Sequence, residues 1–213
     1  MLNNEQILNN KTDFSGLLRT ITREGSDIDS LIKKLESSDF FYAPASTEYH
    51  NSFKGGLCDH CLNVCSNMLQ LVEMNADALG VNPEEVRESV IIVSLLHDFS
   101  KMNTYEEGVK NEKVYFDGGS KHDDLGNFDW VSKRVYKTRK DKFVFGSHES
   151  TSEFMVRQFI PLTVAESVAI LHHMGSMSWD SAKDNIGEVF NNYWLALLLY
   201  QADMLSTYVN ERY

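Results

Sequence analysis

Prolines, cysteines and long apolar runs are all scarce in this chain. Only three prolines and three cysteines occur among 213 residues. Few prolines leave helices uninterrupted over long stretches. No apolar run approaches the roughly 18 residues of a membrane-spanning helix, and the polar start of the chain does not resemble a signal peptide. We therefore expect a helical protein located in the cytoplasm, without a membrane partner.

Positive charge is also in short supply. Twenty lysines and arginines face 31 aspartates and glutamates, which gives a formal net charge of −11 at pH 7. A protein that grips long nucleic acid needs a broad positive surface, so we do not expect long nucleic acid as a partner. A small anionic substrate would need only a local basic patch. Residues 133–142 supply one, with the side chains of Lys133, Arg134, Lys137, Arg139, Lys140 and Lys142.

The three cysteines, Cys58, Cys61 and Cys65, lie within eight residues. Together with His60 they suggest a zinc knuckle, but a second Cys or His pair at the spacing of a structural zinc site is missing. Cys61 and Cys65 stand one helical turn apart, as small apolar core residues do. We expect free thiols and keep the zinc knuckle as the alternative.

The apolar pattern is typical of helices, and we predict an all-α single domain over residues 1–213. A chain of this length buries well over half of its unfolded surface, which is enough to enclose a pocket. We expect about seven helices. They would form a helical bundle at about 40–210, preceded by a helical N-terminal extension at 1–39 that includes a short amphipathic helix at 27–36.

Two N-cap signatures mark the starts of helices. Asn82 precedes Pro83, and Thr163 is followed three residues later by Glu166. The first pair places a capping amide before a proline at the first helical position, and the second is a capping box. The last helix, expected at 187–210, is apolar on most faces and should be buried.

Between residues 103 and 147 the helical pattern lapses. Gly118 and Gly119 separate short stretches rich in valine and aromatic residues. This pattern predicts an irregular loop, with a small hairpin as one option. An insertion of this length in a compact domain is usually a functional lid or binding loop, or else disordered.

His97 and Asp98 are the most informative residues of the chain, because they follow directly on the apolar run at 90–96. A buried ionisable group costs several kcal/mol unless it is compensated, and a divalent cation is the simplest compensator. Further imidazoles and carboxylates lie near expected helix ends or within apolar stripes: His60, His148, His173 and Asp203. Such ligands suit Mn²⁺, Fe²⁺, Co²⁺, Ni²⁺, Zn²⁺ or Mg²⁺.

One or two ions fit this set. A first metal would be held by His60, His97, Asp98 and Asp203. If Asp98 bridges, His148 and His173 would hold a second metal about 3.5 to 4 Å away, as in sites that clamp phosphoryl oxygens. The water between the metals would then be the nucleophile.

In order and type, His60, His97-Asp98 and Asp203 resemble the ligands of the HD-domain metal-dependent phosphohydrolase superfamily, over about residues 40–210. The segments 49–57 and 169–175 resemble a bacterial and phage branch that hydrolyses nucleotides or RNA ends. The resemblance implies an all-helical fold. It also implies that His60, His97, Asp98 and Asp203 bind a first metal and that His148 and His173 bind a second. One departure is Gly146-Ser147-His148-Glu149, where many relatives have Gly-His-Gly-Glu.

Asp98 and Lys101 are the expected catalytic residues. The resemblance assigns Lys101 a phosphate contact, where a cation would neutralise charge that develops on the phosphate. We expect Trp130, Arg134 and Lys137 to bind the substrate, with Trp130 or Tyr136 stacking on a base. His50, His122 and His172 receive no role.

The leading hypothesis is a metal-dependent hydrolase of phosphoesters or phosphoanhydrides in small nucleotides. The alternatives are a 3′-to-5′ exoribonuclease or phosphodiesterase, a catalytically silent nucleotide-binding HD sensor, and a metal-dependent oxygenase. Assembly into a homo-oligomer remains open.

Overall fold

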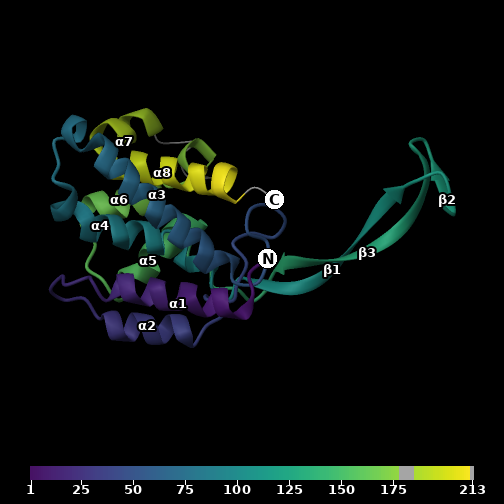
Figure 1. The fold of residues 1–213 in the computed structure, drawn as a ribbon, viewed down its shortest axis with the longest axis horizontal. Helices are drawn as coiled ribbons and strands as arrows, with labels where there is room; N and C mark the ends of the chain where they lie inside the picture. Colours follow the sequence, from purple (N-terminus) through teal and green to yellow (C-terminus); the bar gives the residue numbers. More distant parts are fainter. Residues whose placement is uncertain (178–184, 212–213) are drawn as a thin grey trace.

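The helices form one body, from which a long β-hairpin projects (Figure 1). The computed structural model describes residues 1–177 and 185–211. Its helices are α1 (Asn4–Leu18), α2 (Ile28–Glu36), α3 (Gly56–Leu79), α4 (Pro83–Leu96), α5 (His148–Val156), α6 (Val164–Leu171), α7 (Ile186–Asn192) and α8 (Trp194–Leu205). Its strands are β1 (Tyr105–Tyr115), β2 (Lys121–Asp123) and β3 (Gly126–Thr138). No helix within the described ranges has the length and apolar character needed to cross a bilayer.

The fold is mostly helical, but the prediction of a strictly all-α fold is wrong for residues 105–138, which we call the arm. β1 and β3 pair antiparallel from Tyr105 opposite Thr138 to Tyr115 opposite Phe128, and β2 adds a short third strand. The arm is much longer than the small hairpin considered from the sequence. Most of its side chains are exposed on both faces, so the burial alternation that identifies a half-buried strand is missing.

The predicted helix starts are confirmed. The side chain of Asn82 accepts a hydrogen bond from the amide of Glu84, and Pro83 opens α4. Thr163 and Glu166 form the predicted capping box at the start of α6. Both signatures depend only on neighbouring residues, which is why the sequence reveals them.

The last predicted helix is interrupted. The backbone of Tyr193 leaves the helical region, so the stretch divides into α7 and α8. After α8 the chain continues as a π-helix, Ser206–Asn210. The single domain predicted over 1–213 also includes residues 178–184 and 212–213, which lie outside the described residues, and it stays a prediction.

The core of the body lies between α3 and α4. Leu57, Val64 and Met68 of α3 are completely buried, as is the apolar end of α4. The three cysteines are free and buried in the same core. Burial raises the pKa of the Cys61 thiol well above its usual value, so the thiol stays protonated at neutral pH. This agrees with the expectation of free thiols.

Four phenylalanines join the N-terminal extension to the segment that follows α4. Phe40 contacts Phe14, Phe41 and Phe99 edge to face, with ring centroids 5.1 to 6.4 Å apart. Phe99 opens the short 3₁₀ helix Phe99–Lys101, called η1 in the following, and it is fully buried. Because Phe99 directly follows Asp98, this aromatic packing fixes the backbone on which Asp98 sits.

A buried ion pair ties the N-terminal extension to α6. Both terminal nitrogens of Arg23 donate to the carboxylate of Glu166 at 2.6 Å. Glu166 is fully buried. Burial alone would raise the pKa of Glu166, but the hydrogen bonds from Arg23 outweigh it and hold that pKa below its usual value. The stability that this pair contributes is therefore present above the unfolded-state pKa of Glu166 and is lost as the pH falls through the lower folded-state value.

We predict that Arg23→Met destabilises the fold by about 3 to 5 kcal/mol, because it leaves the Glu166 carboxylate buried without its partner. The measurement is the free energy of unfolding in urea at pH 7. Lys11→Met is the matched control, because it breaks the solvent-exposed pair between Lys11 and Glu36, which should be worth at most about 1 kcal/mol. Equal losses in the two variants would contradict the prediction.

Candidate metal centre

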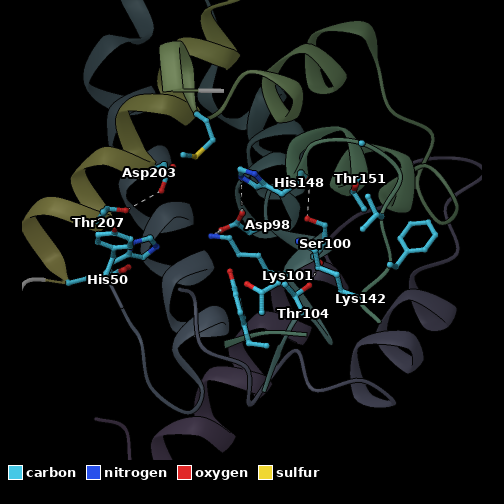
Figure 2. A pocket seen from close by; sticks show the side chains of 18 of the residues that line it. His50, Asp98, Ser100, Lys101, Thr104, Lys142, His148, Thr151, Asp203 and Thr207 are labelled. Carbon is cyan, nitrogen blue, oxygen red and sulfur yellow. Dashed lines mark hydrogen bonds and ion pairs between the residues drawn. The ribbon is translucent and has the colours of Figure 1, made fainter. Parts of the chain in front are cut away.

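A cavity of about 900 Å³ opens where α8, η1, the start of α5 and the base of the arm meet. Asp98, Lys101, His148 and Asp203 line its wall (Figure 2). Tyr105 and Thr138, the paired residues at the base of the arm, line it as well. The cavity is therefore bounded by both the body and the arm.

The predicted ligands come from the ends of several helices. His97 is the C-cap of α4 and Asp98 follows it directly, while His148 opens α5 and His173 lies just beyond α6. His60 is near the start of α3 and Asp203 is in the second half of α8. Ser100 contributes to this convergence, because its hydroxyl donates to the carbonyl of His148 at 2.8 Å and so joins η1 to α5.

The two oxygens of Asp98 face two different pairs of imidazoles. Oδ2 lies 3.7 Å from Nε2 of His60 and 3.4 Å from Nε2 of His97. Oδ1 lies 3.7 Å from Nε2 of His173 and 3.9 Å from Nε2 of His148. On the first side, Oδ1 of Asp203 is 3.2 Å from Nε2 of His60. The structure thus brings all six predicted ligand residues together around one carboxylate.

Two of the histidines are fixed in the tautomer that a metal requires. Nδ1 of His97 donates to the carbonyl of Ser94 at 2.8 Å, and Nδ1 of His173 donates to the carbonyl of Ile170 at 2.7 Å. A carbonyl can only accept, so the proton is on Nδ1 and the lone pair of Nε2 faces the centre. This is the arrangement found around metal-bound imidazoles.

Several atoms at the centre need a partner. Within residues 1–177 and 185–211, Nε2 of His97, His148 and His173 and Oδ1 of Asp98 are buried and make no hydrogen bond. Buried polar atoms are rarely left unpaired, because each costs about 1 to 3 kcal/mol. Two ligand groups have all their donor atoms within 4.8 Å of one another, namely His60, His97 and Asp203, and His97, Asp98 and His173. The donor set therefore fits one or two divalent cations.

The charges of the site agree with this fit. Burial would raise the pKa of Asp98, but Lys101 and His97 hold it well below its usual range. The ammonium of Lys101 is 2.7 Å from Oδ2 of Asp98. Burial and the neighbouring His97 lower the pKa of His173 to about 3, so its imidazole is neutral at pH 7. Ionised carboxylates and neutral imidazoles are the forms that bind metal.

His60 differs, because burial would lower its pKa but its hydrogen bonds to Asp203 and Glu211 outweigh burial and raise that pKa to about 10. A cation that bound at Nε2 of His60 would therefore displace a proton.

The three arm residues predicted to bind substrate lie outside the set that lines the cavity. Trp130, Arg134 and Lys137 are on β3. Trp130 is half exposed beside Phe128 and Lys113, and the ammonium of Lys137 donates to the carbonyl of Val109. Their role in substrate binding stays a prediction. Of the basic segment 133–142, Lys142 does line the cavity.

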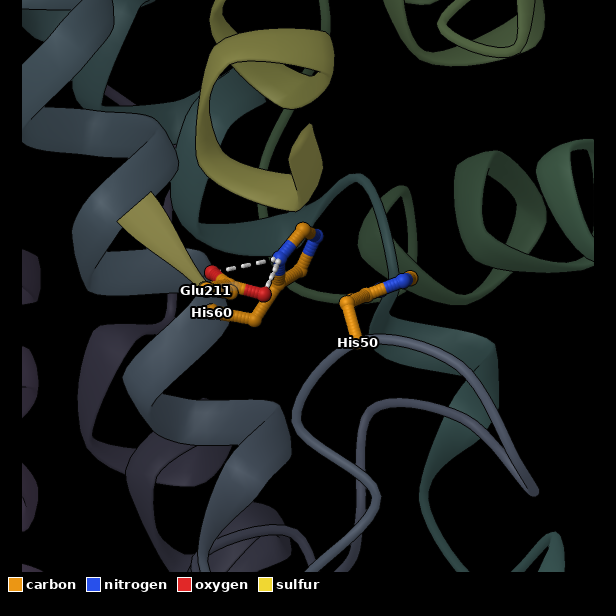
Figure 3. A group of neighbouring side chains, drawn as sticks. All are labelled: His50, His60 and Glu211. Carbon is orange, nitrogen blue, oxygen red and sulfur yellow. Dashed lines mark hydrogen bonds and ion pairs between the residues drawn. The ribbon is translucent and has the colours of Figure 1, made fainter. Parts of the chain in front are cut away.

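Two residues for which the sequence analysis predicts no role, His50 and Glu211, lie at the centre. A carboxylate oxygen of Glu211 accepts a hydrogen bond from Nδ1 of His60 at 3.0 Å (Figure 3). The ring of His50 is 4.7 Å from the ring of His60, and its Nε2 is buried with no hydrogen bond to any described residue. Glu211 lies in a polar sequence that is typical of an exposed helix end. Its position at the centre depends on the local π-helix, which the sequence does not indicate.

Similarity to known proteins covers part of the chain. Over 101 residues it is 32% identical to a dihydroneopterin 2′,3′-cyclic phosphate phosphodiesterase from Methanocaldococcus jannaschii. The aligned region is 47% of this chain and 37% of the relative, so the chain matches little more than a third of the relative's length. No protein-family profile matches the chain, and no solved structure does. A distant relative is therefore a phosphodiesterase.

We predict that Asp98→Ala loses all bound metal, whereas His173→Ala loses one ion of two, because Asp98 faces both ligand sets and His173 faces one. Metal content after loading with Mn²⁺ or Co²⁺ and desalting is measured by mass spectrometry. Circular dichroism should show unchanged helicity, because the apolar core is untouched. His122→Ala, which alters an exposed histidine on β2, is the matched control. Full metal content in Asp98→Ala would contradict the assignment.

Proposed function

We propose that the chain is an HD-type metal-dependent phosphohydrolase that cleaves phosphoesters of small nucleotides or nucleotide-like molecules in the cytoplasm. The observation that carries the proposal is the position of Asp98, whose two oxygens each face a separate pair of imidazole nitrogens. A bridging carboxylate between two ligand sets is the arrangement of a two-metal hydrolytic site. The phosphodiesterase relative supports the same class of reaction.

The six residues would hold the ions as follows. The first ion takes His60, His97, Asp98 and Asp203. The second takes Asp98, His148 and His173. When bound, such cations supply Lewis-acid activation of a water and of phosphoryl oxygens. Their identity among Mn, Fe, Co, Ni, Zn and Mg is left to experiment.

Among the described residues, Lys101 is the cation best placed to bind the substrate phosphate. Its side chain is mostly buried, lines the cavity and contacts Asp98. Burial would lower the pKa of Lys101, but Asp98 outweighs it and raises that pKa, so the ammonium stays charged. Once metal ions compensate Asp98, the ammonium is free to contact a phosphoryl oxygen and to stabilise the charge that develops during displacement. Lys142 adds a second positive charge on the same cavity wall.

The rest of the cavity suits a planar group attached to the phosphate. Tyr49, Tyr105, Phe143 and Tyr208 line it, and aromatic side chains stack on bases whatever their sequence. The relative acts on a 2′,3′-cyclic phosphate. We therefore propose nucleotide-like cyclic phosphates as the first substrates to test.

The decisive experiment is turnover of a substrate panel by protein stripped with EDTA and reloaded with each metal. The panel contains 2′,3′-cyclic and 3′,5′-cyclic nucleotides, nucleoside mono-, di- and triphosphates, and short RNA. We expect selective hydrolysis of one small phosphoester, lost again on addition of EDTA. Metal binding without any turnover would favour the HD sensor, and oxygen-dependent chemistry with iron would favour the oxygenase.

Lys101→Met should lower kcat on the selected substrate by about 100- to 1,000-fold, the loss typical of removing one stabilising donor. Its metal content should stay at the wild-type level, because Lys101 is not a ligand. Lys33→Met, on the exposed side of α2, is the control. A Lys101→Met enzyme with wild-type kcat would remove Lys101 from the mechanism.

The exoribonuclease alternative draws support from the arm, because its base lines the cavity and its strand β3 carries basic and aromatic residues. Replacing residues 107–136 by Asn-Gly closes the ribbon with a two-residue turn and keeps its base. We expect this variant to retain its kcat/KM on small phosphoesters. Loss of RNA cleavage alone would promote the alternative. A raised KM for small substrates would show that the arm helps to bind them, and Trp130→Ala and Arg134→Ala would then test the two predicted residues.

A further inference from the structure

The histidines at the centre have their Nδ1 atoms held in two different ways. His97 and His173 follow the C-terminal ends of α4 and α6, where the last carbonyls of a helix are free to accept hydrogen bonds. Each uses the carbonyl three residues before it. His60 lies near the N-terminal end of α3, where the nearby carbonyls are engaged by amides further along the helix. His60 therefore needs an acceptor from outside its own helix.

Glu211 supplies that acceptor. Its two carboxylate oxygens lie 3.0 and 3.1 Å from Nδ1 of His60 (Figure 3). Glu211 is only 3% exposed, and Nδ2 of Asn63 donates to it at 3.1 Å. His148, which opens α5, has a similar neighbour, because Oε2 of Glu149 is 3.1 Å from its Nδ1. A carboxylate therefore lies beside each of these two histidines, but only Glu211 accepts a hydrogen bond, because both oxygens of Glu149 are without a hydrogen-bond partner among the described residues.

A local change of helix type brings Glu211 to His60. In a continuous α-helix, a residue eight positions after Asp203 would be rotated about 80° away from it. The π-helix Ser206–Asn210 has wider turns, which return Glu211 to the side of Asp203. Asn67 of α3 fixes this segment by donating to the Ser206 hydroxyl at 2.8 Å and to Asn210 at 2.9 Å. One helical stretch therefore contacts both ring nitrogens of His60.

We propose that Glu211 is a positioning residue for the first metal ion, a role that rests on the metal site of the proposed function. It accepts a hydrogen bond from Nδ1 of His60 and fixes the ring orientation, so that Nε2 faces Asp98 and Asp203, the carboxylates with which it would share the first ion. In metal sites generally, removing a carboxylate that holds a metal-bound histidine in this way lowers the metal affinity about 10- to 100-fold.

A competing assignment would make His50, His60 and Glu211 ligands of another ion, because their donor atoms also lie within 4.8 Å of one another. That ion would take Nδ1 of His60 while Nε2 serves the first metal, so the ring would have to lose both protons. The spacing of 3.0 Å between Nδ1 and the carboxylate is that of a hydrogen bond. The hydrogen-bonded arrangement needs no such deprotonation.

The test is metal affinity, measured by titrating Mn²⁺ into EDTA-stripped protein and following free Mn²⁺ by electron paramagnetic resonance. Glu211→Ala should weaken the first ion about 100-fold, and Glu211→Gln, which keeps an acceptor oxygen, about 10-fold. The second ion, whose ligands do not include His60, should bind as in the wild type. Asn210→Ala is the matched control, because it removes a contact of the same segment to α3 and leaves the carboxylate in place.

The outcomes separate this proposal from the proposed function. Unchanged affinity in Glu211→Ala overturns the role of Glu211, whether or not the protein hydrolyses phosphoesters. Equal weakening of both ions, or the same loss in Asn210→Ala, shows a general structural effect and also overturns it. A third ion in the wild type that both His50→Ala and Glu211→Ala lose favours the competing assignment. Metal binding with the predicted losses but no turnover leaves the proposal intact and rejects only the hydrolase. A wild type that binds neither Mn²⁺ nor any of Fe²⁺, Co²⁺, Ni²⁺, Zn²⁺ and Mg²⁺ overturns both.

Discussion

The buried carboxylate of Asp98 is the group on which the arrangement of the centre depends. It is 1% exposed and lies among four imidazoles, with Lys101 as its nearest cation. Asp203 and Glu211, which are also buried, add further negative charge. Lys101 and the protonated ring of His60 together still leave one of these three carboxylates uncompensated in a site that is shielded from water. Added positive charge at the centre would compensate it and would also give the unpaired imidazole nitrogens a partner.

The fold meets this demand by assembling the centre from the ends of helices. A helix end leaves backbone groups free, and two of the histidines use them to fix their tautomers. The contact between the rings of Phe40 and Phe99 holds the backbone next to Asp98 in place. Side chains held in this way are already arranged, so little ordering would oppose the binding of a metal ion.

An interaction can be predicted from the sequence when the residues that it joins are close together along the chain. The caps at Asn82 and Thr163 could be predicted because they involve residues within three positions. The ligand residues could be selected because ionisable side chains at the end of an apolar run need compensation, although only the fold shows that they converge. The arm could not be foreseen at its full length, because strands exposed on both faces lack the alternation that identifies them. Glu211 was missed because its position depends on a π-helix that the residue pattern does not announce.

The arm bears on the size of the substrate. It carries six lysines and arginines against seven aspartates and glutamates, so it is nearly neutral in a chain of net charge −11. A polyanion that approached the cavity along the arm would meet less repulsion than one that crossed the body. In the distal half, the rings of Phe128 and Trp130 contact each other edge to face, and Lys113 is paired with Asp123 and lies over the Phe128 ring. The arm reaches the cavity only at its base, where Tyr105 and Thr138 line the wall, whereas Asp98 lies inside the body. Under the proposed function, the arm could therefore affect only substrates that extend beyond the cavity.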